Sequence, residues 1–157
     1  MKVSTSRLTF ALTLIALMFA GAAVVAQMPA ATKEKDLVAA GHKKLTGSQI
    51  LPRVLGNTSY VNQLASVPGA PAGINYAIYY RNERERVFRP AEGGGPRFVA
   101  NWWIEGDFIC GEEKGPGPAG HRCYALYDLA PFTYICRQPD GACNSVSRVV
   151  RGNPENL

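Results

Sequence analysis

Short runs of β-forming residues, repeated after Thr58, constrain the fold of this chain more than any other feature. Tyr, Ile, Val, Phe and Trp recur in these runs, and Gly, Pro, Asn or Asp interrupts them. No helical period returns after Thr58, which is typical of an antiparallel β protein. We expect strands at Ser59–Ala65, Ile74–Arg81, Glu83–Arg89, Phe98–Glu105, Phe108–Gly111, Arg122–Asp128, Phe132–Arg137 and Asn144–Arg151. Such a series of short strands joined by turns predicts a small antiparallel barrel or a strongly curled sheet.

One short N-terminal helix is expected before the strands, at Ser48–Leu55. Thr46 or Ser48 can accept the first backbone N–H groups, and Gly56 suits the left-handed residue that ends a helix. The apolar residues share one face: Ile50, Val54 and Leu55. The helix should therefore lie on the sheet or plug one end of it.

The N-terminus has the pattern of a signal peptide. Lys2 and Arg7 precede an apolar run from Leu8 to Val25, and small residues around Ala26 suit a signal peptidase. The run of 18 residues approaches the roughly 20 that span a bilayer, so an uncleaved anchor is the alternative. We expect cleavage of residues 1–26, a periplasmic or secreted protein, and no stable membrane anchor afterwards.

The exported part is one domain with a leader. Residues 27–44 are rich in Ala, Lys and Glu, with only Leu37 and Val38 to bury, which predicts a flexible leader. Residues 45–157 are long enough for a single β domain with its own core. Loss of Lys2 and Arg7 lowers the formal net charge from +5 to about +3. That charge is too small to indicate binding of nucleic acid.

Four cysteines lie between Cys110 and Cys143, and in an exported chain they predict two disulfides. Four cysteines allow three connectivities; their order favours Cys110 with Cys123 and Cys136 with Cys143. The turn residues at 139–141 support the second pair, because they place its two cysteines near each other. A zinc site would need Cys110, His121 and Cys123, but the spacing is poor and oxidation competes for the thiols. We expect no metal and no cofactor.

The stretch from Asn101 to Tyr124 carries both tryptophans, and its two faces differ. A turn at Gly106-Asp107 places Ile104 opposite Ile109, and Trp103 opposite Cys110. One face is then wholly apolar and should be core: Phe98, Ala100, Trp102, Ile104 and Ile109. Trp102 belongs to this face. Trp103 lies on the mixed face, where it either packs over the Cys110–Cys123 disulfide or offers a stacking platform to a ligand or partner.

Charged and aromatic side chains supply further candidates for a binding site. Five arginines between Arg81 and Arg97 alternate with Glu83, Glu85 and Glu92. They form either a solvated edge that resists aggregation or an anion-binding patch for phosphate or carboxylate groups of the cell envelope. The aromatic residues of the same region either line a cavity or fill the core: Tyr76, Tyr79, Tyr80 and Phe88. The candidate ligand-binding residues are Trp103, Tyr80, Arg86 and His121.

The chain resembles the bacterial secreted family catalogued as domain of unknown function 995. The resemblance rests on five features in order: Leu45-Thr46-Gly47 with Ile50, Gly56-Asn57-Thr58, Trp102-x-Ile104 before Cys110, Cys123-Tyr124, and Gly152-Asn153-Pro154. It covers roughly residues 45–157 and implies a periplasmic address and a compact β architecture, with no activity to carry over. The second cysteine pair and the Gly-Pro loop before His121 depart from the family pattern.

The sequence thus predicts an exported, non-enzymatic binding module. Its expected partner is a small apolar or envelope-derived ligand, or an envelope protein. One alternative is a structural or docking protein of the envelope without a ligand pocket. Another is a small hydrolase or isomerase that uses His121 with Glu112 or Glu113, which are close in sequence.

Overall fold

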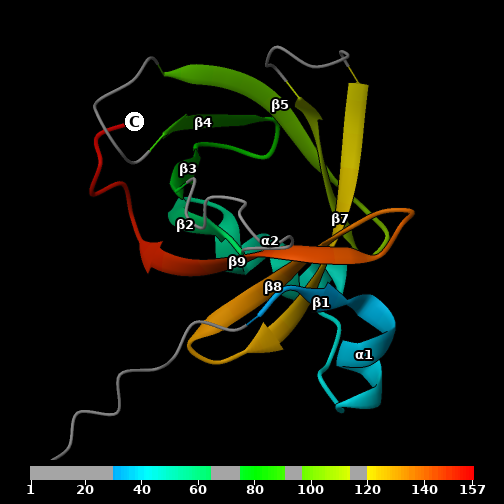
Figure 1. Cartoon of the computed structure of the whole chain (residues 1–157). Helices are drawn as coiled ribbons and strands as arrows, with labels where there is room; N and C mark the ends of the chain where they lie inside the picture. The colour runs from blue at the N-terminus through cyan, green and yellow to red at the C-terminus, as the bar shows by residue number, and fades with distance from the viewer. Residues whose placement is uncertain (1–29, 65–74, 91–96, 114–119) are drawn as a thin grey trace, which may run out of the picture.

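In the part of the chain that the structure describes, the strands form an eight-stranded antiparallel barrel, accompanied by two short helices and two disulfides. Figure 1 shows the arrangement of the helices and strands. A computed structural model describes residues 30–64, 75–90, 97–113 and 120–157. The elements in chain order are β1 (Thr32–Lys33), α1 (Glu34–Ala39), α2 (Gly47–Val54), β2 (Asn57–Gln63), β3 (Asn75–Tyr80), β4 (Glu85–Pro90), β5 (Phe98–Glu105), β6 (Phe108–Glu113), β7 (Gly120–Leu129), β8 (Phe132–Arg137) and β9 (Ala142–Arg151).

Each strand from β2 to β9 pairs with the next, and β9 pairs with β2 to close the barrel. In that closing pair Asn57 lies opposite Arg151, and Gln63 lies opposite Ser145. Short β1 pairs with the start of β9, beyond the end of β2. All eight expected strands are present, so the predicted fold class is confirmed. Ala65 and Ile74, expected at strand ends, lie outside the described residues, as does the expected signal peptide.

Helix α2 packs against β2, β5 and β6 and lines one end of the barrel interior, in agreement with the expectation that its apolar face lies on the sheet or plugs one end of it. The side chain of Gln49 accepts the backbone N–H of Thr46 at 2.9 Å, which caps the first turn. The backbone N–H of Gly47 donates to Oδ1 of Asp107 at 3.0 Å, so the start of α2 is tied to the turn between β5 and β6. Gly56 follows the helix with a φ of 69°, the left-handed conformation expected there.

The apolar core at this end is built around Trp102, which is 1% exposed. Its Nε1 donates to the carbonyl of Asn82 at 2.7 Å, and its ring meets Tyr80 edge to face at 4.8 Å between centroids. The other buried members of this cluster come from α2, the segment before it and the strands β6 and β7: Leu45, Ile50, Val54, Ile109 and Leu126. The predicted opposition of Ile104 to Ile109 and of Trp103 to Cys110 is confirmed.

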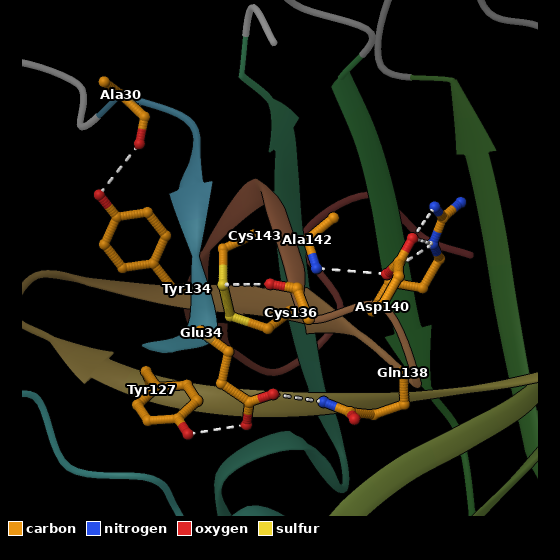
Figure 2. The surroundings of a disulfide bond; sticks show 11 residues. Ala30, Glu34, Tyr127, Tyr134, Cys136, Gln138, Asp140, Ala142 and Cys143 are labelled. Carbon is orange, nitrogen blue, oxygen red and sulfur yellow. Dashed lines mark hydrogen bonds and ion pairs between the residues drawn. A yellow bond between two sulfur atoms is a disulfide. The ribbon is translucent and has the colours of Figure 1, made fainter. Parts of the chain in front are cut away.

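A second core lies on the outside of the barrel, beneath β1 and α1. Leu37 of α1 is 4% exposed and packs on outward-facing residues of β7, β8 and β9. Glu34 fixes the segment in place (Figure 2): its carboxylate accepts the hydroxyl of Tyr127 and the amide of Gln138, each at 2.8 Å. Its N–H donates to the carbonyl of Gly141 at 2.8 Å.

This outer layer corrects the expectation for residues 27–44. Composition predicted a flexible leader there, and a single helix in the chain, whereas residues 32–39 form β1 and the additional helix α1. The segment needs few apolar residues to stay on the barrel surface. The packing of Leu37 and the hydrogen bonds of Glu34 attach it there jointly. Polar anchoring of this kind leaves no periodic signal in the sequence.

Replacing Tyr127 with phenylalanine should test this anchor. Burial, together with the hydrogen bond to Glu34 and its charge, raises the pKa of Tyr127 from 10.0 to about 12. A raised pKa stabilises the fold below about pH 10, and this contribution is lost as the pH rises through about 12. The variant should lose about 1–2 kcal/mol of unfolding free energy at pH 7. At alkaline pH the wild type also loses unfolding free energy as the Tyr127 phenol ionises. The variant has no such phenol, so it should not show this part of the loss.

Urea unfolding between pH 7 and pH 12 measures both effects. Tyr79→Phe, on β3 and away from Glu34, is the control for loss of a tyrosine hydroxyl. Equal alkaline losses in the wild type and in Tyr127→Phe would contradict the role given to this hydrogen bond.

Candidate functional site

The barrel contains a partly open cavity of about 520 Å³, lined by residues of α2 and of seven barrel strands. An eight-stranded barrel is just wide enough to be filled by its own side chains or to hold one small ligand. This volume lies within the range of small-molecule sites. Arg53 and Val54 of α2 form part of the lining, so the helix is the floor of the cavity.

The lining has two chemically different walls. The wall formed by β2, β8 and β9 carries the hydroxyl and amide groups of Ser59, Gln63, Thr133, Asn144, Ser145 and Ser147, together with the aliphatic side chains of Val61, Ile135, Ala142 and Val149. The wall formed by β3, β4 and β7 carries mainly aromatic and aliphatic groups: Tyr76, Ile78, Tyr80, Phe88, Tyr124 and Leu126. A cavity with both kinds of wall suits a ligand that has polar and apolar parts.

Arginine is the main charged residue of the lining, with Arg53, Arg86, Arg122 and Arg137 against the single acid Glu112. Arg53 forms an ion pair with Asp128 at 3.0 Å, and Arg137 pairs with Asp140 at the turn between β8 and β9. The Arg137 guanidinium holds the pKa of Asp140 down to about 2. Two of the four arginines are therefore neutralised by acids that do not line the cavity.

Arg86 is bound differently, because a backbone carbonyl takes the place of an acid. Its Nη2 donates to the carbonyl of Glu112 at 3.3 Å, a long hydrogen bond. Its Nε is buried and has no hydrogen-bond partner within the described part of the chain. The guanidinium lies against Gly111 of β6, where a Cβ atom would come within 2.5 Å of Nη2. The absence of a side chain at Gly111 thus leaves room for Arg86 inside the barrel.

Tyr80 lies beside Arg86 at the inner end of the cavity and is 5% exposed. Burial raises the pKa of the Tyr80 hydroxyl, and the positive charge of Arg86 and a hydrogen bond to it oppose that rise. The phenol therefore stays neutral, and its hydroxyl is a polar group beside the guanidinium.

The four candidate ligand-binding residues fall into two separate places. Tyr80 and Arg86 line the cavity. Trp103 and His121 lie on the outer face, where their ring centroids are 5.9 Å apart. Trp103 is half-buried opposite Cys110, and its Nε1 donates to Glu105 at 3.3 Å. Trp103 therefore has its role on the outside of the barrel, whether it packs over the Cys110–Cys123 disulfide or offers a stacking platform to a ligand or partner.

The acids proposed as partners of His121 have different neighbours. Glu112 lies directly opposite His121 in the register of β6 and β7, but its carboxylate accepts the side-chain amide of Asn101 at 3.0 Å. The side chain of Glu113 lies outside the described residues. Cys110 and Cys123 are bonded to each other, as predicted, so their sulfur atoms are not thiolate ligands for a metal.

Sequence reasoning missed the other polar groups of the cavity, although strand parity could have found them. Arg122 has the same parity as Tyr124 and Leu126, which were expected to face the core. Likewise, Arg137 shares a face with Thr133 and Ile135. Alternation therefore places these arginines inside the barrel once the neighbouring residues are assigned to the core.

Comparisons with protein-family models, with curated proteins and with solved structures found no match for this chain. The resemblance to the family of domain of unknown function 995 therefore stays a prediction. Among the described residues, no helix has the length and apolar character needed to cross a membrane.

Proposed function

We propose that this protein is an exported binding module that holds a small ligand inside its barrel. The observation that supports the proposal best is the cavity of about 520 Å³, which has one mainly polar and one mainly apolar wall. A structural protein without a ligand needs no such space, because close packing of side chains is the more stable arrangement. The closed floor formed by α2 and the two cross-strand disulfides supply a rigid container.

The disulfides also support an oxidising compartment. Together with the predicted signal peptide, they favour a periplasmic or secreted location. A ligand available there is a small metabolite or a fragment of the envelope. The resemblance to a secreted bacterial family points the same way.

Filling the cavity should abolish binding. Ser147 and Arg148 are neighbours on β9 and point to opposite faces: Ser147 lines the cavity and Arg148 is exposed. Ser147→Phe puts a ring into the ligand space, whereas Arg148→Phe adds the same ring outside. We expect the first to weaken binding about tenfold or more and the second to change it less than about twofold.

The probe is the neutral dye N-phenyl-1-naphthylamine, whose fluorescence rises when it enters an apolar site. Titration into the wild-type protein should show one saturable site, and circular dichroism should confirm that both variants are folded. Absence of saturable binding, or equal binding by the two variants, would reject a ligand site inside the barrel. That result would favour the structural or docking alternative.

A further inference from the structure

Resting on the proposed function, we infer that the ligand carries an anionic group and that Arg86 binds this group inside the barrel. The ligand class is an amphipathic acid: a carboxylate, sulfonate or phosphate attached to an apolar or aromatic body. Arg86 would hold the acid group, and the aromatic wall would cover the body.

Arg86 has more hydrogen-bond donors than the residues around it use. A guanidinium has five N–H donors and is always charged. The described residues provide a long hydrogen bond to the carbonyl of Glu112 and a hydrogen bond to the neutral hydroxyl of Tyr80, and no described carboxylate forms an ion pair with Arg86. Its buried Nε is unpartnered in the described part of the chain. Arg86 is half-buried, and a charge that is partly removed from water is costly unless an acid neutralises it.

Arg86 differs from four other described arginines in the charge of its neighbours. Arg53, Arg81, Arg89 and Arg137 each form an ion pair with a described acid. Arg89, on the same strand as Arg86 but of opposite parity, pairs with Glu155 on the outer face. Arg86 faces the cavity with a neutral phenol and a carbonyl as neighbours. An acid from outside the chain would supply the missing counter-charge.

The position of Arg86 in the barrel also suits the binding of an acid group. The guanidinium lies over Gly111, so it is held across the interior from β4 toward β6. Phe88 is the next inward residue along β4, and Tyr80 lies opposite Arg86 on β3. An acid group bound at Arg86 would therefore have aromatic rings beside it. A planar guanidinium binds such groups through two parallel N–H···O hydrogen bonds.

Two dyes that differ in one acid group test the inference. 8-Anilinonaphthalene-1-sulfonate is an aromatic anion, and N-phenyl-1-naphthylamine is the same ring system without the sulfonate. In the wild type the anion should bind more tightly than the neutral dye, and only its affinity should fall as salt is added. Arg86→Gln should weaken the anion about 10–100-fold and change the neutral dye less than about threefold.

Two further variants make the test independent of a folding defect. Arg84→Gln removes an exposed arginine close to Arg86 and should leave both affinities unchanged. Gly111→Ala keeps Arg86 but places a methyl group where Nη2 lies. Because the end of a flexible side chain can move aside, this variant should fold normally. It should weaken the anion about tenfold and spare the neutral dye.

The possible failures are distinguishable. If neither dye binds the wild type, or if Ser147→Phe binds both normally, the proposed function is wrong. If both dyes bind in the cavity but Arg86→Gln and Gly111→Ala leave their affinity ratio unchanged, a ligand site exists and the inference about its anionic group is wrong.

Discussion

Replacement of Trp102 with alanine is expected to destabilise the barrel by about 3–5 kcal/mol, the range for a large buried aromatic residue. Three interactions are lost together. The ring is 1% exposed within the cluster that joins α2 to the strands. It also packs edge to face on Tyr80, and its Nε1–H donates to Asn82. Loss of this ring opens a void between the barrel wall and the helix that closes it.

The adjacent tryptophan is a matched control for this prediction. Trp103 is half-buried on the outer face, so Trp103→Ala should cost about 1 kcal/mol. Urea unfolding followed by near-ultraviolet circular dichroism measures both variants. A similar loss in the two variants would show that the faces of β5 are assigned wrongly, since a shift of one residue exchanges them.

Removal of the Cys110–Cys123 disulfide is expected to cost about 3 kcal/mol, on the chain-entropy model. The two cysteines are 13 residues apart in sequence and lie directly opposite each other on β6 and β7. The disulfide therefore closes the loop between these strands in the unfolded chain as well as in the folded one. The double variant Cys110→Ala/Cys123→Ala lacks this restriction and gains entropy on unfolding.

The second disulfide shows how the loss of stability should depend on loop length. Cys136 and Cys143 are only seven residues apart, and their removal should cost about 2.4 kcal/mol on the same model. Denaturant unfolding of both double variants, and of the wild type with reductant, gives the comparison. A loss below about 1 kcal/mol for the Cys110–Cys123 pair would show that the loop entropy model does not describe this barrel.

The strands and their register could be predicted because local signals and side-chain alternation agree along most of the chain. The turn at Gly106-Asp107 sets the pairing of β5 with β6, and that pairing places Trp102 inside and Trp103 outside. The order of the cysteines then indicated both disulfides. In each case neighbouring residues carried the information.

The order of the N-terminal segment and the place of Arg86 could not be predicted, because both depend on contacts between residues far apart in the sequence. Glu34 binds Tyr127 and Gln138, which lie about a hundred positions later in the chain. No local sequence pattern indicates that Glu34 orders the N-terminal segment. Arg86 is part of a charged run that is typical of a solvated edge. It could be assigned to the inside only when closure of β9 onto β2 showed that the sheet encloses a space.

The two walls of the cavity also have a stereochemical consequence. Hydroxyl and amide groups lie on the side of β2, β8 and β9, while aromatic rings lie on the side of β3, β4 and β7. A ligand held by its acid group at Arg86 would have one flank against each wall. Mirror-image forms of a chiral acid would then present opposite substituents to the hydroxyl groups, so the barrel would distinguish one enantiomer from the other.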